Sequence, residues 1–452
     1  MFDRVLVANR GEIAVRVIRA LHELGIEAVG VYSTADRDAL HVELADHAVC
    51  IGPPSAAESY LRISNVVAAA ETTGCDAVHP GYGFLAENGA FVRACAESNL
   101  VFIGPPAEVV EQMGDKIRAK EAMRAAGVPL VPGSDGAFGL DELRRAAADA
   151  GFPVLLKAAA GGGGKGMRLV ASAKELDAAF GAATAEADAA FGDGSLYVEK
   201  LVSPARHVEI QVLCDSAGGV LTLGERECSI QRRHQKLVEE SPSAALNAET
   251  REEMEATVER ACAAIGYRNA GTFEFLVAPD GAFYFIEVNC RLQVEHPVSE
   301  LVTGIDIVRE QIRIAAGDPL QTTGRASRRG HAIEIRINAE DPMRGFLPAP
   351  GTITRFDAQL GPGIRVDTAV SAGSEITPYY DSLIAKLVVW DETRAAVIAR
   401  AERALRELAI EGIPTTRDLA LDVLGSPEFR SGEYSTSTLS ELAGRVPSLA
   451  ST

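Results

Sequence analysis

Polar and apolar residues alternate without interruption from Glu287 to Glu295. In an extended chain this period of two places alternate side chains on opposite faces. One face is apolar, and the other carries Glu287, Asn289, Arg291, Gln293 and Glu295. The pattern predicts an extended segment through Glu295 whose polar face can hold cations and anions. An ordinary half-buried strand with a wet face gives the same alternation.

A β-hairpin is predicted just upstream. Aromatic and β-branched residues fill two runs within 271–288, and the turn sequence Ala278-Pro-Asp-Gly281 separates them. Folding at this turn places Glu274 nearly opposite Glu287. Together with Asn289, these carboxylates form an oxygen-only ligand set that suits Mg²⁺ or Mn²⁺ and suits zinc poorly. A purely structural pair of glutamates is the alternative, although directly opposed like charges destabilise a sheet.

A glycine-rich loop lies between two short predicted strands, at 153–157 and 167–170. The loop, Ala158-Ala-Ala-Gly-Gly-Gly-Gly-Lys-Gly166, therefore caps a hairpin. A Walker A loop needs Gly-Lys followed by Ser or Thr and then a helix, and a dinucleotide fingerprint needs a strand-to-helix turn, so neither fits. Bare glycine N–H groups beside a lysine can close over phosphates. A flexible linker has the same composition.

Both ends of the chain carry α/β patterns. Strands at 5–8 and 28–32 enclose an amphipathic helix at 12–24, which predicts a Rossmann-like unit without a Gly-x-Gly-x-x-Gly. In the run 331–341, isoleucines alternate with polar residues, so Arg336 points to a polar face. A further helix is predicted from Thr393 to Leu408.

Composition narrows the class of protein. At 452 residues the chain is too long for one core and suggests about three domains. A formal net charge of −19 argues against nucleic-acid binding and against anionic membrane surfaces. The N-terminus lacks a signal-peptide pattern, and no apolar run reaches transmembrane length. Seven cysteines without a Cys-x-x-Cys favour reduced thiols, so we expect a cytoplasmic enzyme.

Several motifs together resemble those of the biotin carboxylase family. In chain order they are Lys157 with Gly161-Gly-Gly-Gly-Lys-Gly-Met167, Glu199-Lys200, Arg206-His-Val-Glu-Ile-Gln211, Gln231-Arg-Arg-His-Gln-Lys236, the hairpin carboxylates, and Arg291-Leu-Gln-Val-Glu-His-Pro297. The run from His79 to Asn88 also resembles a family motif near the substrate cleft, although a tight Pro-Gly turn explains it equally well. The resemblance extends from Val5 to about Arg445.

The resemblance implies an α/β protein with the ATP-grasp fold. Residues 1–113 would form a Rossmann-like N-terminal domain and residues 114–330 the ATP-grasp domain, with a mobile lid at about 132–201. Residues 331–446 would form the C-terminal biotin carboxylase domain. Where the family often has other residues, this chain has Ala160, Lys165 and Pro362. Ala160 and Lys165 would change the degree of lid closure, and Pro362 would change the strength of a dimer contact.

The activity implied by the resemblance is ATP-dependent carboxylation of biotin with bicarbonate, through carboxyphosphate. Glu295 would be the general base, acting directly or by relay through carboxyphosphate, and Arg336 would stabilise the biotin enolate. Arg291 would hold bicarbonate, and Lys236 would orient bicarbonate or carboxyphosphate. Two Mg²⁺ or Mn²⁺ ions would bind Glu274, Glu287 and Asn289. The ATP site would comprise Lys116, Lys157, Gly161, Gly162, Gly163, Gly164, Lys165, Gly166, Met167, Glu199, Lys200, His207, Gln231, His234, Gln293 and Val294.

The resemblance also implies partners. No Met-Lys-Met biotinylation motif occurs, so we expect a biotin carboxyl carrier on another polypeptide or one separated from this chain. A carboxyltransferase subunit would select the acceptor, and a homodimer is expected. Two alternatives are a carbamoyl-phosphate synthetase-like ATP-grasp ligase and a catalytically silent scaffold subunit. A silent subunit would be expected to have lost Lys116, Lys236, Glu274, Glu287 or Glu295, and all five are present.

Overall fold

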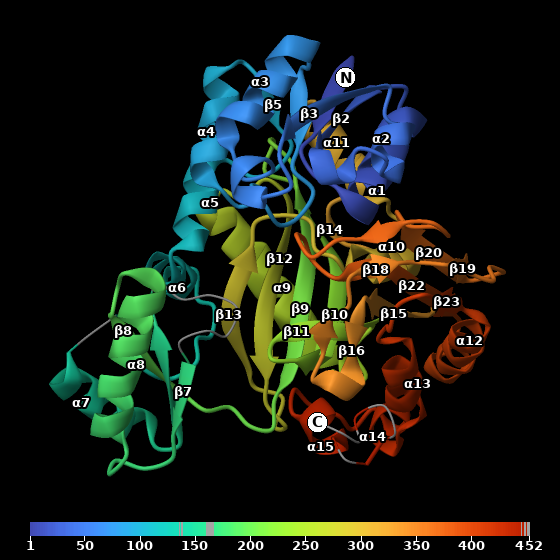
Figure 1. The fold of residues 1–452 in the computed structure, drawn as a ribbon. Helices are drawn as coiled ribbons and strands as arrows, with labels where there is room; N and C mark the ends of the chain where they lie inside the picture. Colours follow the sequence, from blue (N-terminus) through green and yellow to red (C-terminus); the bar gives the residue numbers. More distant parts are fainter. Residues whose placement is uncertain (135, 137–138, 160–166, 444, 447–448, 450–452) are drawn as a thin grey trace.

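The computed structural model describes residues 1–452 except 135, 137–138, 160–166, 444, 447–448 and 450–452. Figure 1 shows an N-terminal region at the top, a small lobe at the lower left, and a large central sheet that continues into the C-terminal region at the right. Among the described residues, no helix has the length and apolar character needed to span a bilayer.

The N-terminal region is a five-stranded parallel sheet with strand order β3-β2-β1-β4-β5. Its central strand is fully buried at Val5, Leu6 and Val7, as expected where helices cover both faces of a parallel sheet. The Rossmann-like pattern predicted from the sequence is therefore confirmed. The elements are β1 (Arg4–Val7), α1 (Gly11–Glu23), β2 (Glu27–Ser33), η1 (Thr34–Asp36), α2 (Leu40–Leu44), β3 (His47–Gly52), η2 (Ala56–Glu58), α3 (Ile63–Thr73), β4 (Ala77–His79), α4 (Gly89–Glu97), β5 (Val101–Phe102) and α5 (Ala107–Gly114).

The small lobe follows α6 (Lys116–Ala125). It is a three-stranded antiparallel sheet in the order β7-β6-β8, against which two helices pack. The hairpin predicted around the glycine loop is present, with Lys157 paired to Met167 at the end next to the loop. The loop itself, Gly161 to Gly166 with Lys165, lies outside the described residues. The elements are α7 (Leu140–Ala150), β6 (Val154–Ala158), β7 (Met167–Val170), α8 (Leu176–Phe191) and β8 (Leu196–Lys200).

A nine-stranded sheet forms the centre of the molecule, with the order β13-β12-β9-β10-β11-β15-β22-β20 and a short β14 beside β10. The sheet crosses the boundary predicted at residue 330, because β11 pairs with β15 along four residues. The strands of this sheet and the helices that connect them are β9 (Arg206–Cys214), β10 (Val220–Arg232), β11 (Gln235–Ser241), α9 (Ala248–Ile265), β12 (Asn269–Val277), β13 (Phe283–Asn289), α10 (His296–Thr303), α11 (Ile307–Ala315), β14 (Gly324–Arg325), β15 (His331–Asn338), β20 (Ile364–Thr368) and β22 (Leu383–Asp391).

The C-terminal region packs short hairpins and helices around the end of this sheet. The predicted helix is confirmed as α12 (Arg394–Glu407), whose N-cap Thr393 accepts a hydrogen bond from the amide of Ala396. The remaining elements are β16 (Glu340–Asp341), η3 (Pro342–Arg344), β17 (Leu347–Pro348), β18 (Gly351–Thr352), β19 (Arg355–Asp357), β21 (Glu375–Ile376), β23 (Ala409–Glu411), α13 (Arg417–Gly425), α14 (Pro427–Ser431) and α15 (Thr438–Leu442).

The extended conformation predicted from Glu287 to Glu295 is wrong beyond Asn289. Strand β13 ends at Asn289, and the chain turns before α10 instead of staying extended to Glu295. The turn is closed by hydrogen bonds from the amide of His296 to the carbonyl of Gln293, and from Val298 to Glu295. Proline in the first helical turn explains the change, because it favours helix initiation. The polar side chains of this segment still converge, but through a turn.

Candidate active site

A cavity of ≈ 1190 Å³ lies where the N-terminal region, the small lobe, the central sheet and the C-terminal region meet. Every region contributes side chains that can carry charge. These include Arg10, Tyr82, Glu87, Lys116, Lys157, Glu199, His207, Lys236, Glu274, Glu287, Arg291, Arg336 and Tyr380. A cavity of this size and polarity can hold a nucleotide together with a second, smaller substrate.

Two carboxylates face each other at the centre of the cavity. Glu274 on β12 and Glu287 on β13 are direct partners across the hairpin, as predicted. Burial by itself would raise the pKa of Glu274, but Lys236 and His207 outweigh it and lower the pKa below the ordinary value. The pKa of Glu287 is raised by burial and by the charge of Glu274. Two opposed carboxylates of this kind attract a cation between them.

The hairpin pair fits a divalent ion chemically. Its donors are hard oxygens, which Mg²⁺ and Mn²⁺ prefer. Asn289 lies at the end of the same strand, where its amide nitrogen donates to Glu274 at 2.9 Å and its oxygen accepts from Arg291 at 3.0 Å. Rotation of this amide would turn its oxygen toward the carboxylates. The predicted ligand set of Glu274, Glu287 and Asn289 is thus brought together.

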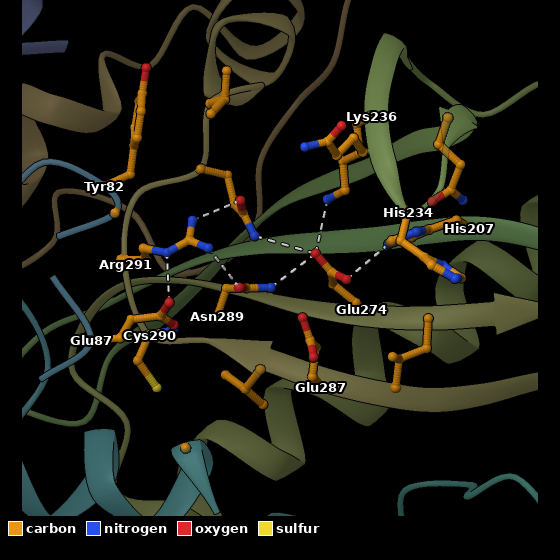
Figure 2. Close-up of a pocket in the computed structure, with 18 of the residues that line it drawn as sticks. Tyr82, Glu87, His207, His234, Lys236, Glu274, Glu287, Asn289, Cys290 and Arg291 are labelled. Atoms are coloured by element: carbon orange, nitrogen blue, oxygen red, sulfur yellow. Dashed lines mark hydrogen bonds and ion pairs between the residues drawn. The ribbon is translucent and has the colours of Figure 1, made fainter. Parts of the chain in front are cut away.

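Arg291 is held in a fixed position beside this pair (Figure 2). Its Nε donates to Glu87 at 2.7 Å, its Nη1 to Gln293 at 2.9 Å, and its Nη2 to Asn289. Glu87 comes from the N-terminal region and also accepts from the amide of Cys290 at 2.9 Å. The motif at His79–Asn88 therefore reaches the cavity. A guanidinium with this support can bind a small planar anion.

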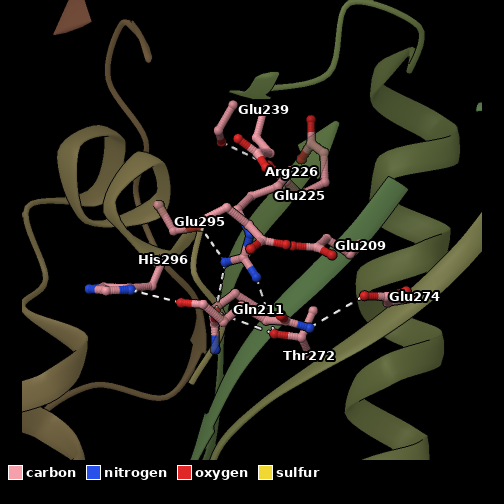
Figure 3. Close-up of polar contacts among 12 residues, drawn as sticks. Glu209, Gln211, Glu225, Arg226, Glu239, Thr272, Glu274, Glu295 and His296 are labelled. Carbon is pink, nitrogen blue, oxygen red and sulfur yellow. Dashed lines mark hydrogen bonds and ion pairs between the residues drawn. The ribbon is translucent and has the colours of Figure 1, made fainter. Parts of the chain in front are cut away.

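The ammonium of Lys236 joins three carboxylates. Its Nζ donates to Glu209 at 2.5 Å, to Glu274 at 2.9 Å and to Glu295 at 2.6 Å. Beneath it, the fully buried Arg226 donates to Glu209 and to side chains on β9, β12 and α10, some of which Figure 3 labels. Charges this deeply buried are stable only when they are paired. The network fixes the lysine between the hairpin carboxylates and Glu295.

Glu295 lies below the surface of the cavity, with 0% of its area exposed. One oxygen accepts from Lys236, and the other accepts from Nη2 of Arg336 at 2.9 Å. Burial favours the neutral acid, but Lys236 and Arg336 outweigh it and hold the pKa of Glu295 well below its ordinary value. Arg336 also donates from Nε to Glu239 at 2.6 Å. The carboxylate predicted to be the base is therefore ionised but fully engaged.

Nine of the predicted nucleotide residues border the same cavity, whereas the six from Gly161 to Gly166 lie outside the described residues and Lys200 does not border it. Lys116, Lys157, Met167, Glu199, His207, Gln231, His234, Gln293 and Val294 all border it. Glu199 forms ion pairs with Lys157 and with Lys120, a lysine that the sequence analysis missed. Burial lowers the pKa of Lys116. The ammonium of Lys200 instead donates to the carbonyls of Gly151 and Phe152 within the small lobe, so its side chain does not face the cavity.

Comparison with known proteins identifies the family of this chain. Three family models match in succession: the biotin carboxylase N-terminal domain over residues 1–110, the ATP-binding domain of the carbamoyl-phosphate synthase L chain over 115–323, and the biotin carboxylase C-terminal domain over 334–441. The biotin carboxylase of Nostoc sp. is 53% identical over 443 residues, which are 98% of this chain and 99% of that protein. The chain belongs to the biotin carboxylase family.

A further relative and two solved structures that are similar to this chain are also biotin carboxylases. Biotin carboxylase 1 of Bacillus subtilis is 51% identical, covering 97% of this chain and 98% of that protein. A solved biotin carboxylase domain dimer of the Hydrogenobacter thermophilus 2-oxoglutarate carboxylase, in complex with MgADP, ADP and bicarbonate, is 50% identical with a TM-score of 0.94 over 98% of both chains. A Campylobacter jejuni biotin carboxylase complex is 49% identical, also with a TM-score of 0.94, over 98% of this chain and 99% of that one.

Membership in the biotin carboxylase family establishes the reaction class and the fold. The chain is an ATP-dependent ligase with the ATP-grasp fold, and it carboxylates biotin with bicarbonate. A carbamoyl-phosphate synthetase-like ligase is disfavoured, because the terminal family models are those of biotin carboxylase. The scaffold alternative is disfavoured too, since the relatives are biotin carboxylases.

Several residues of this biotin carboxylase site escaped the sequence analysis. Glu87 lies in the run from His79 to Asn88, which resembles a family motif, but the sequence did not indicate a role for its carboxylate. Glu209 follows His207 by two residues on β9 and is the register partner of Glu274, so period two could have identified it. Arg226 carries no local signal, because its burial depends on strands distant in the chain.

Proposed function

We propose that the cavity performs both steps of biotin carboxylation, with nucleotide at the end near the small lobe and biotin near Arg336. One observation carries this assignment: the ammonium of Lys236 contacts Glu274 of the hairpin pair and also Glu295. The phosphate end and the biotin end are therefore adjacent. A reactive intermediate formed at one end has a short path to the other.

In the first step, bicarbonate attacks the γ-phosphorus of ATP and gives ADP and carboxyphosphate. Arg291 and Lys236 hold bicarbonate, and Lys116 and Lys157 hold the phosphates, because fixed cations stabilise the charge that develops there. Divalent ions held by Glu274, Glu287 and Asn289 neutralise charge on the transferred group when bound. Carboxyphosphate then breaks the bond between its carbon and the bridging oxygen, which releases CO₂ and inorganic phosphate beside biotin.

In the second step, Glu295 takes the ureido proton of biotin, and Arg336 stabilises the resulting enolate. The ureido nitrogen of the enolate then forms a bond to the carbon of CO₂ and gives carboxybiotin. Both oxygens of Glu295 are engaged before biotin arrives. When the ureido oxygen accepts a hydrogen bond from Nη2 of Arg336, that group leaves Glu295, and the pKa of the carboxylate rises. The base thus gains strength only when its substrate is in place.

The test is the substitution Glu295→Gln, assayed as ADP release with Mg²⁺, ATP, bicarbonate and free biotin. We expect the biotin-dependent rate to fall by roughly 10² to 10⁴-fold, the usual contribution of a general base, while ATP binding persists. Glu392→Gln, at an exposed ion pair with Arg329, is the matched control. Unchanged turnover in Glu295→Gln would remove this residue from the mechanism.

We also propose the partners. Biotin reaches the cavity on a carrier protein or domain, and a carboxyltransferase subunit passes the carboxyl group to an acceptor. A homodimer is supported by the dimeric Hydrogenobacter domain. We assign residues 1–113, 114–330 and 331–446 as three domains, with a mobile lid at about 132–201. Sedimentation of the purified chain tests the dimer, since a monomer at all concentrations excludes it.

A further inference from the structure

Two buried carboxyl groups lie behind Arg336 and have no role in the mechanism above. Glu239 on β11 and Glu334 on β15 are direct register partners on adjacent antiparallel strands. Each has 0% of its surface exposed. Directly opposed residues project to the same face with Cβ atoms about 5 Å apart, within reach of a hydrogen bond between carboxyl groups.

Their hydrogen bonding is incomplete. Of four oxygens, only Oε1 of Glu239 has a donor, the Nε of Arg336 at 2.6 Å. Oε2 of Glu239 and both oxygens of Glu334 have no hydrogen-bond partner among the residues that the structure describes. A buried ionised carboxylate without donors is costly. A proton held between the two groups supplies the missing donor.

The surrounding charges support one proton on the pair. Arg336 and Lys236 face Glu239, and Lys386 on β22 faces Glu334. Glu295 adds negative charge to both, while Lys386 is itself paired with Glu12 on α1 and Asp367 on β20. The other titratable neighbours are the thiol of Cys228 on β10 and the hydroxyl of Tyr82.

These charges affect the two groups unequally. Burial, opposed by Arg336 and reinforced by Glu295, raises the pKa of Glu239 to about 7. Burial, opposed by Lys386, raises the pKa of Glu334 well above its ordinary value. Glu334 is therefore the group that keeps its proton at neutral pH. Glu239 is the group that ionises.

We propose that Glu239 and Glu334 share one proton and together position Arg336 for the biotin enolate. The inference rests on the proposed role of Arg336. Ionised Glu239 accepts a hydrogen bond from Nε of Arg336 and keeps the guanidinium in place. The Nη2 group can then exchange its hydrogen bond to Glu295 for one to biotin while the position of the side chain is unchanged. Protonated Glu334 donates to the free oxygen of Glu239 and keeps that carboxylate directed at Arg336. Both glutamates are positioning residues, because they act on biotin only through Arg336.

The first test is the pH dependence of kcat for biotin-dependent ADP release. In the wild type, kcat should rise with pH through about 7 as Glu239 ionises. Glu239→Gln should lower kcat about 10- to 100-fold, the equivalent of one charge-assisted hydrogen bond, and abolish this step while the KM for ATP is unchanged. Undiminished kcat, or a pH step that persists in Glu239→Gln, would overturn the proposal.

The second test addresses the shared proton. Glu334→Leu removes the donor to Glu239 and should move the pH step upward, because a hydrogen bond to the charged form is lost. Glu334→Gln restores a donor and should bring the step back toward the wild-type position. A step unmoved in Glu334→Leu, or equally displaced in both variants, contradicts a donor at this position.

Thermal melting of each variant checks folding. If a variant does not fold, the infrared spectrum of the wild type decides: a protonated carboxyl band that persists above pH 7 supports the shared proton, and its absence overturns it. The result for Glu295→Gln separates this inference from the proposed function. If Glu295→Gln is inactive and Glu239→Gln is fully active, only the positioning pair is wrong.

Discussion

Glu87 offers a direct test of how the N-terminal region supports the bicarbonate site. Its carboxylate accepts from Nε of Arg291 at 2.7 Å and from the amide of Cys290 at 2.9 Å. In Glu87→Gln only the amide oxygen can accept, so one of these two hydrogen bonds and the charge are lost. In either orientation of the new amide, the guanidinium of Arg291 loses its charged partner, and the support that Glu87 gives it is weakened.

The expected loss follows from the exposure of the pair. A hydrogen bond to a charged group contributes about 1.5–3 kcal/mol, but the Glu87 side chain is 39% exposed and that of Arg291 19%, so screening places the effect near the lower limit. A loss of about 1.4 kcal/mol is tenfold. We therefore expect the KM for bicarbonate to rise about tenfold while the KM for ATP changes little.

The assay is ADP release titrated with bicarbonate at saturating ATP. Glu111→Gln is a suitable control, because it breaks an ion pair with Arg93 on the same region outside the cavity lining. An unchanged KM for bicarbonate in Glu87→Gln would refute the reasoning that Arg291 binds bicarbonate in the position Glu87 gives it.

Three further predictions follow from the same contacts. Lys236→Met leaves its three buried carboxylates without their common ammonium, so it should abolish turnover and destabilise the fold by about 3–5 kcal/mol; an unchanged melting temperature, followed by the fluorescence of the single tryptophan, would contradict the burial argument. Glu287→Gln removes one of two opposed carboxylates and should raise the Mg²⁺ concentration needed for half-maximal activity; an identical Mg²⁺ titration would exclude it as a ligand. Burial lowers the pKa of His41 to about 4, below the unfolded value of about 6.5, so stability is lost as pH falls from 6.5 to 4; His41→Gln should lose less over this window, as measured by melting temperature against pH.

The hairpin that carries the opposed carboxylates was predictable because its information is local. The turn at Ala278-Pro-Asp-Gly281 sets a register in which Phe275 pairs with Phe285, and the sequence predicts this part of the hairpin. A register shift between Glu274 and Phe275 then places Glu274 opposite Glu287, and alternation alone does not predict that shift. The α/β pattern of the N-terminal region was local for the same reason. The roles near Arg291 and Arg336 came from resemblance to a family, since several motifs occurred in the family's order.

What could not be predicted depends on contacts between distant segments. Alternation showed that Glu334 shares a face with Arg336, but not that β15 would lie between β11 and β22 with α10 packed over the sheet, which leaves Glu334 fully buried. The turn after Asn289 was missed because alternation was given more weight than the proline at the start of α10. Lys200 matched a family motif, yet the direction of its side chain depends on the carbonyls of the small lobe.

The continuous sheet has a consequence for how such a chain can be divided. The segment assigned as the C-terminal domain contributes β15, β20 and β22 to the same sheet that carries the hairpin carboxylates. Separating the chain at residue 330 would expose the edge of β11 and of β15, and free edges of this kind invite aggregation. Fragment expression, domain exchange between relatives and permutation of the termini therefore have to keep β11 and β15 together.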